Sequence, residues 1–197
     1  MYEPSRSAQA ILALAKNFSK AKSKQAKLRR YGWSKPPEGV IKLNVDATFD
    51  PDRGTGGTCA ILRDEAGFFV AASCSNIPFV EDAATAEARG MRDGLLLANE
   101  VGCNKICVES DCMEVVEVMQ GGGNSLGPAA AIYEECSFLA RNFISFMFSH
   151  RPREANAAAD LLARNSEFSH TIVWRSEPPE FLVDVLTNDV SLFAHEI

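Results

Sequence analysis

The sequence predicts an α/β domain in which helices cover both faces of a mixed, five-stranded sheet. Three segments between residues 40 and 75 alternate apolar and polar side chains, which is typical of half-buried strands. From residue 82 to 165, helical periodicity alternates with short apolar runs, as in crossovers between parallel strands. The 197 residues are 46% hydrophobic and 23% charged, enough for one domain with its own core. No apolar run is long enough to predict a membrane span.

The first three strands are expected to form an antiparallel meander. In the first strand, over 40–46, the apolar face carries Ile41, Leu43 and Val45, and the polar face carries Lys42, Asn44 and Asp46. A turn rich in Gly, Pro and Asp over 50–57 leads to a second strand over 57–64. A tight turn over 65–67 then leads to a third strand over 68–75. Asp46 is thereby expected to point away from the apolar face of its strand.

The rest of the domain is expected to alternate helices and strands in the order βββαβααβα. The expected elements are a helix over 82–101, a strand over 105–109, a helix through Met119 capped by Ser110 or Asp111, a helix over 128–140, a strand over 143–148 and a helix over 154–165. Glycines after the first and second helices are plausible stop signals.

The charge is distributed unevenly along the chain, whose net charge is −6. Residues 1–35 carry nine Lys or Arg and one acid, whereas the remainder has a net charge of −14. The predicted organisation is a basic, partly helical leader over 1–33, the α/β domain over 34–170 and a tail over 171–197. The leader is either a frayed helix without further role or a basic arm that binds nucleic acid or directs targeting.

The six cysteines form no CxxC pair and lie mostly in apolar runs. We expect reduced, buried thiols in an intracellular protein, nuclear or cytoplasmic. The start of the chain lacks the pattern of a secretory signal, which also predicts that the protein is not secreted or membrane-bound.

Four carboxylates are candidates for a shared site: Asp46, Glu87, Asp111 and Asp160. Each also has a structural explanation, because a strand surface, a helix N-terminus or a cap can hold an acid. Several carboxylates brought together repel one another unless cations neutralise them. Oxygen ligands favour Mg²⁺ or Mn²⁺ over Zn²⁺, and two such ions can support phosphodiester hydrolysis. Spacing alone does not decide whether the four acids meet.

The sequence resembles the ribonuclease H family, in the reverse-transcriptase-like form found in plant genomes and non-LTR retroelements. The resemblance covers residues 33–193 and rests on four motifs in order. These motifs are the entry to the first strand over 33–46, the glutamate helix over 85–95, the acidic motif over 108–116 and the last motif over 149–163.

The resemblance implies a ribonuclease H-like fold and a two-metal endonuclease that hydrolyses the RNA strand of RNA–DNA hybrids. It implies that Asp46, Glu87, Asp111 and Asp160 hold two Mg²⁺ or Mn²⁺ ions. It also implies that Glu87 meets a 2′-hydroxyl, and that His150 assists proton transfer or product release. We expect a monomer whose partner is the hybrid.

Several features favour an alternative function on the same fold. Ala47 follows Asp46 where many members have Gly, and no Lys or Arg occurs between Lys105 and Arg141, where the family's basic protrusion lies. The alternative is a catalytically weak or inactive nucleic-acid-binding or interaction module derived from a retroelement. A 3′–5′ exonuclease on a related four-acid site and a purely structural role are the further alternatives.

Overall fold

The computed structural model describes residue 20 and residues 32–165 and 170–191. The chain divides into two compact units, Met1–Gly32 and Trp33–Ile197. Apart from Lys20, the helix expected over 8–29 lies outside the described residues. No helix among the described residues has the length and apolar character needed to cross a membrane. The second unit carries the fold described below.

Its centre is a six-stranded mixed sheet in the order β5-β4-β1-β2-β3-β6. The strands are β1 (Ile41–Asp50), β2 (Thr55–Arg63), β3 (Phe69–Ile77), β4 (Lys105–Ser110), β5 (Ser145–His150) and β6 (Ile172–Arg175). The antiparallel pairs are β1 with β2, β2 with β3 and β3 with β6. The parallel pairs are β1 with β4 and β4 with β5. The mixed α/β prediction is confirmed. Five strands become six because β6, from the segment predicted as a tail, pairs with β3.

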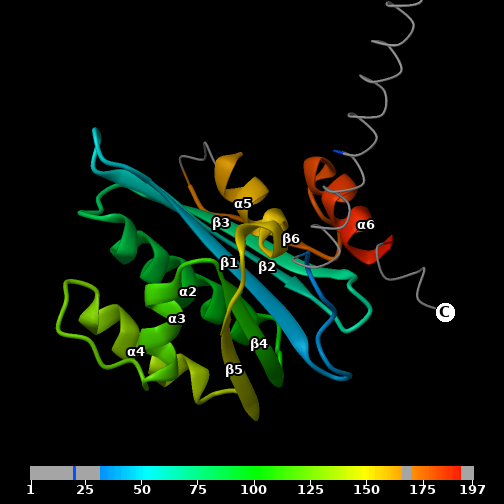
Figure 1. Cartoon of the computed structure of the whole chain (residues 1–197), viewed down its shortest axis with the longest axis horizontal. Coiled ribbons are helices and arrows are strands. Elements are labelled where there is room, and N and C mark those ends of the chain that lie inside the picture. Colours follow the sequence, from blue (N-terminus) through cyan, green and yellow to red (C-terminus); the bar gives the residue numbers. More distant parts are fainter. Residues whose placement is uncertain (1–19, 21–31, 166–169, 192–197) are drawn as a thin grey trace, which may run out of the picture. The chain divides into compact units, whose positions relative to one another are not determined.

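The helices cover both faces of the sheet, as predicted (Figure 1). They are α2 (Ala83–Glu100), α3 (Met113–Gln120), α4 (Ala130–Ala140), α5 (Ala157–Arg164) and α6 (Val183–Ser191), with 3₁₀ turns η1 (Arg153–Ala155) and η2 (Glu180–Leu182). Leu43 and Val45 belong to the core that α2, α3 and α4 cover, while Cys59 and Ile61 belong to the core under α5 and α6. The alternation along β1 and β2 therefore serves two separate cores.

Element boundaries differ from the predictions where a side chain completes a turn. β1 continues to Asp50, because Asp50 pairs with Thr55 and its carboxylate accepts from the backbone of Asp52 and Arg53. The cap predicted for α3 is wrong: Cys112 is the N-cap and makes no side-chain cap bond. Instead, Oγ of Ser110 accepts a hydrogen bond from the backbone N–H of Cys112, at 3.0 Å.

The prediction that all six cysteines are reduced is also wrong. Cys59 and Cys74 form a disulfide, while Cys103, Cys107, Cys112 and Cys136 are free. The two residues are direct cross-strand partners on β2 and β3, with Cα atoms 4.2 Å apart. This register comes from strand pairing, so cysteine counting could not reveal it.

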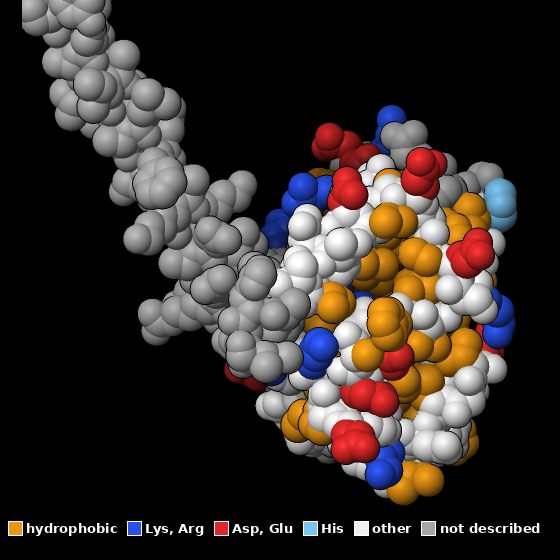
Figure 2. Space-filling model, turned by 90° about the vertical axis from the view of Figure 1, so that its right-hand side faces the viewer, with side chains coloured by type: hydrophobic (Ala, Val, Ile, Leu, Met, Phe, Trp, Pro, Cys, Tyr) orange, Lys and Arg blue, Asp and Glu red, His pale blue; other side chains and the backbone are white. Residues whose placement is uncertain are grey.

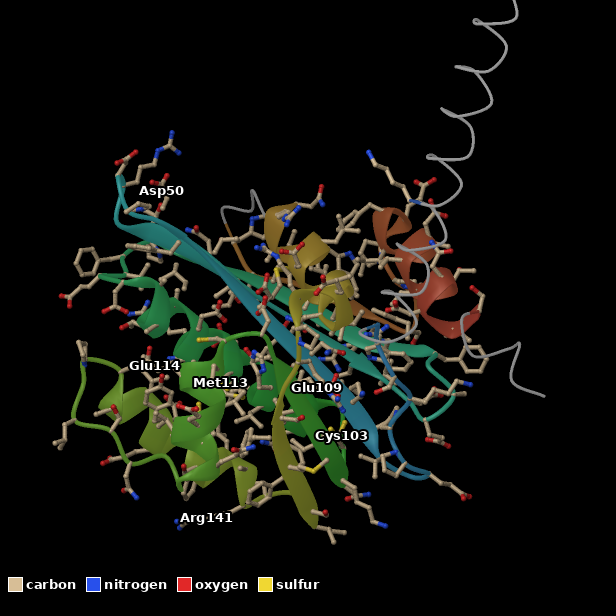
Figure 3. All side chains as sticks on the ribbon, in the orientation of Figure 1. Asp50, Cys103, Glu109, Met113, Glu114 and Arg141 are labelled. Atoms are coloured by element: carbon tan, nitrogen blue, oxygen red, sulfur yellow. A yellow bond between two sulfur atoms is a disulfide. The ribbon has the colours of Figure 1, made fainter. Side chains whose placement is uncertain are left out.

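Six buried polar residues form what we name the paired cluster, on the α5 and α6 side of the sheet: Lys42, Asn44, Arg63, Glu109, Asn156 and Asp189. Its first half centres on Glu109, which accepts from Lys42 at 2.6 Å and from Asn44 at 3.2 Å. Arg151, which is partly exposed, adds a third donor at 3.0 Å. The buried carboxylate of Glu109, which Figure 3 labels on β4, therefore accepts from three side chains.

The second half of the paired cluster fixes α6 to the sheet. Arg63 donates to Asp189 of α6 at 2.7 Å and to Asn44 at 3.0 Å. Trp33 lies against Arg63, with 3.9 Å between the guanidinium carbon and the ring centroid, and donates to Asn44 at 3.1 Å. Burial raises the pKa of Asp189, and the charge of Arg63 opposes that shift. α6 thus supplies the counter-charge that a fully buried arginine requires.

Candidate metal centre

Three of the predicted carboxylates converge at one end of the β1–β4 pair. Asp46, Glu87 and Asp111 each offer an oxygen, and these oxygens all lie within 4.8 Å of one another. Asn44 of β1 is the partner of Glu109 of β4 in a parallel register. Asp46 lies two residues after Asn44, and Asp111 lies two residues after Glu109, so both point to the same face of the sheet. Parallel pairing therefore brings the two aspartates together.

Glu87 reaches the group from the other side of the sheet, because α2 approaches β1 closely. A Cβ on Gly94 would lie 2.6 Å from Cγ1 of Val45, and one on Gly90 would lie 3.3 Å from the carbonyl oxygen of Asp46. The backbone of Ala47, next to Asp46, opposes the raised pKa of the Glu87 carboxyl. Sequence reasoning missed these two glycines, although their spacing of four on one helix face could have indicated close packing.

The charges of this group are poorly compensated. Burial raises the pKa of Asp46 to about 7, with further contributions from the charges of Asp111 and Asp160. Burial, followed by the charges of Asp46 and Asp111, raises the pKa of Glu87 to about 8. Oε2 of Glu87 is buried without a hydrogen-bond partner among the described residues. Negative charge is therefore costly here without a cation.

The fourth predicted carboxylate, Asp160, lies outside the group of three. It is buried in the first turn of α5, but both of its oxygens bind arginines. Oδ1 accepts from Nε of Arg153 at 2.9 Å and from its Nη2, and Oδ2 pairs with Arg164 at 2.9 Å. Its charge still acts on Asp46. Asp160 therefore belongs to the same electrostatic neighbourhood while being paired within the protein.

His150 ends β5 beside the group. Its Nε2 lies 3.2 Å from the backbone carbonyl oxygen of Asp111, and the ring is half-buried. The arrangement places the imidazole ring against the backbone of a residue of the carboxylate group.

Hydrogen bonds of the paired cluster join the elements that carry the candidate site. Asn156, which immediately precedes α5, donates to the carbonyl oxygen of Val45 at 2.8 Å and accepts from Asn44 at 3.2 Å. Glu109 lies two residues before Asp111, and Arg151 directly follows His150. The strands and the helix that carry the candidate site are thus joined by buried hydrogen bonds.

These residues fit a hard divalent cation. Carboxylate oxygens are the ligands that Mg²⁺ and Mn²⁺ prefer, and a cation would neutralise the repulsion among Asp46, Glu87 and Asp111. The unpartnered Oε2 of Glu87 is an oxygen that such a cation could satisfy.

A comparison with family models gives one match that spans most of the second unit. The model described as reverse transcriptase-like matches residues 44–166. The chain belongs to the reverse transcriptase-like family. The matched range contains all five of the predicted site residues.

Similar proteins agree on a ribonuclease H-like domain. An Arabidopsis thaliana protein named as a ribonuclease H protein is 30% identical over 149 residues, which are 75% of this chain but only 24% of that protein. The chain thus spans about a quarter of the length of this curated relative.

Solved structures show the same fold. The N-terminal RNase H domain of a Mycobacterium tuberculosis protein, solved as a fusion with maltose-binding protein, is 26% identical with a TM-score of 0.60, covering 64% of this chain and 92% of that one. RNase H1 from Halobacterium salinarum is 21% identical with a TM-score of 0.60, covering 64% and 96%. The ribonuclease H-like fold and the predicted family are therefore confirmed.

Proposed function

We propose that this reverse transcriptase-like domain hydrolyses the RNA strand of RNA–DNA hybrids and requires Mg²⁺ or Mn²⁺. The observation that carries the proposal is the convergence of Asp46, Glu87 and Asp111 within 4.8 Å in a chain of this family. A solved structure of similar fold is LC11-RNase H1 in complex with an RNA/DNA hybrid. That protein is 22% identical to this chain, with a TM-score of 0.53. That complex makes the hybrid the natural candidate substrate.

Each site residue has a proposed role. Asp46, Glu87 and Asp111 hold the cation, and Asp160 completes a second cation site. Divalent ions held there would activate water and stabilise the charge that develops on the phosphate. Glu87 also contacts the 2′-hydroxyl that distinguishes RNA from DNA. His150, beside Asp111, carries a proton to or from the reacting groups or assists product release.

The surface of α3 and α4 favours a second candidate, a binding module with weak turnover. Glu114, Glu117, Glu134 and Glu135 are exposed there, and Lys or Arg is absent from the sequence between Lys105 and Arg141. Figure 3 labels Glu114 and Arg141. Such a surface repels phosphates, so this face would not help to bind a hybrid, and turnover would be slow.

The experiment is cleavage of a labelled RNA–DNA hybrid at low salt in Mg²⁺ or in Mn²⁺. Asp46→Asn should reduce the rate by about 10³-fold, because it removes a charged ligand from the reacting centre. Asp52→Asn, an equal change at an exposed acid in the β1–β2 turn, should leave the rate unchanged.

An RNA–RNA and a DNA–DNA duplex serve as substrate controls. Cleavage restricted to the hybrid and lost in Asp46→Asn supports the enzyme. Folded protein that binds the hybrid without cutting it in either metal supports the binding module instead.

A further inference from the structure

The strongest unexplained feature is the double ion pair on Asp160. Arg153 in η1 and Arg164 in α5 each bind one oxygen of this carboxylate. The side chain of Asp160 is 13% exposed, whereas the two arginine side chains are 63% and 60% exposed. A carboxylate implied as a metal ligand is therefore already occupied by protein cations, and each of those cations can swing away into solvent.

The two arginines differ in what else they influence. The charge of Arg153 also acts on Asp46, where it opposes the raised pKa, and it does the same at Glu87. The charges of Asp46 and Asp111 in turn help Asp160 to raise the pKa of Arg153. Arg153 thus neutralises part of the whole carboxylate group, whereas Arg164 forms an (i, i+4) pair along α5.

We propose that Arg153 is an internal counter-ion of the site, which a second divalent cation must displace from Asp160 before this carboxylate can bind it. The inference rests on the proposed metal site. Asp46, Glu87 and Asp111 bind one cation without any rearrangement of Asp160, since their oxygens are already grouped. The second cation competes with a guanidinium for Oδ1 of Asp160, and it therefore binds more weakly than the first.

The competition is reversible because the arginine side of the ion pair is mostly exposed, although the carboxylate is not. A guanidinium displaced from Asp160 is hydrated in the solvent beside it, so a divalent cation can open the pair. Arg153 therefore acts as a positioning residue: it holds Asp160 in place beside the group while the second cation is absent. The number of bound cations then depends on metal concentration over a wide range.

The test is calorimetric titration of Mn²⁺ into the full chain, which needs no substrate and no turnover. The wild type should show one stronger and one weaker binding step. Arg153→Gln should tighten the second step roughly five- to tenfold, since a competing charge is removed, and tighten the first step by a smaller factor, since the Arg153 charge also acts on Asp46 and Glu87.

Three variants make the result specific. Arg153→Lys keeps the charge and should restore the weak second step. Arg164→Gln removes an equally exposed partner of the same carboxylate and should change the second step less than Arg153→Gln does. Asp160→Asn should abolish the second step and leave the first, and thermal melts in EDTA confirm that every variant is folded.

The inference is overturned if Arg153→Gln leaves the second step unchanged, or if Arg153→Gln and Arg164→Gln have equal effects. Two equally strong steps in the wild type, or no Mn²⁺ binding, would overturn it as well. The proposed function is judged separately by hybrid cleavage. Stepwise binding as predicted without cleavage contradicts the nuclease alone, and cleavage with an unresponsive second step contradicts the role of Arg153 alone.

Discussion

Two groups of buried charged residues lie side by side on the same strands, and they differ in whether the protein neutralises their charge. In the paired cluster, Glu109 has three donors and Arg63 has a carboxylate partner. Two residues further along β1 and β4, Asp46 and Asp111 lie beside Glu87, and one Glu87 oxygen has no partner among the described residues. Burial alone does not distinguish structure from function here. The distinction is whether the protein supplies the counter-charge.

A second comparison concerns an apolar surface beside α6. α6 and the β2–β3 turn border an apolar hollow of about 520 Å³, lined in part by Phe68, Val183 and Leu186. Figure 2 shows hydrophobic side chains gathered on this side of the molecule. The buried face of α6 holds Asp189 against Arg63 and packs Leu186 into the core, so α6 joins the sheet through a charge pair and through apolar contacts.

The largest expected effect comes from breaking the paired cluster. Glu109→Gln should lower the free energy of unfolding by about 3–5 kcal/mol, because Lys42 stays buried without its charge partner. Urea denaturation measures the loss. The matched control, Glu117→Gln on the exposed face of α3, should change stability by less than about 0.5 kcal/mol. Equal effects of the two variants would contradict the assignment of Glu109 as a structural acid.

Supplying the missing cation should produce the next largest effect. Mg²⁺ at about 100 times its dissociation constant should stabilise the fold by about 2.7 kcal/mol, because it binds the folded state and not the unfolded one. Thermal denaturation with and without EDTA measures the shift. Asp46→Asn should lose most of it, whereas Asp52→Asn should retain it. An equal shift in both variants would place the cation elsewhere.

The pH dependence of stability without metal should follow the raised pKa values. Asp46 and Glu87 titrate near 7 and 8 when folded, above their ordinary values of 3.8 and 4.5, so the folded state holds more protons between those limits. Their stabilising contribution is full below pH 4 and is lost as the pH rises through 7 and 8. In EDTA, stability should fall by on the order of 2 kcal/mol between pH 7 and 8.5.

Denaturation at several pH values in EDTA checks this slope. Glu87→Gln removes one of the two titrating groups and should flatten it, while Glu117→Gln should not. A slope that is identical in wild type and Glu87→Gln would show that other groups, such as histidines, cause it.

The smallest expected effect is a gain in stability at the site itself. Asp46→Asn should raise the free energy of unfolding by about 1 kcal/mol at pH 8 in EDTA, because it removes one of the mutually repelling carboxylates. The gain should disappear in saturating Mg²⁺, where the wild-type charge is neutralised. Destabilisation by Asp46→Asn in EDTA would mean that the Asp46 charge is satisfied within the protein, as that of Glu109 is.

Much of the fold could be predicted from the sequence because periodicity reports burial. The alternation in β1 correctly separated Leu43 and Val45 from Lys42, Asn44 and Asp46. It could not show that all three polar residues are buried, nor that two of them are paired while Asp46 is not. That difference depends on Glu109, Arg63 and Asn156, which lie far away in the sequence.

The other misses also depend on contacts between distant segments. β6 has four residues and is a strand because it pairs with β3. The Cys59–Cys74 bond follows from the register of β2 and β3. Asp160 stood out in the sequence as an acid among small apolar residues. Its partner Arg164 lies four residues further along α5, but its partner Arg153 depends on the η1 turn that precedes the helix.

The most direct test of the account is the proton release that accompanies Mg²⁺ binding, measured by calorimetry in buffers of different ionisation enthalpy. If the cation binds Asp46 and Glu87, these protonated carboxyls must lose their protons on binding. The account predicts release of about one to two protons per protein at pH 6.5 and far less at pH 9. Binding at pH 6.5 without proton release, or binding that Asp46→Asn retains, would contradict it.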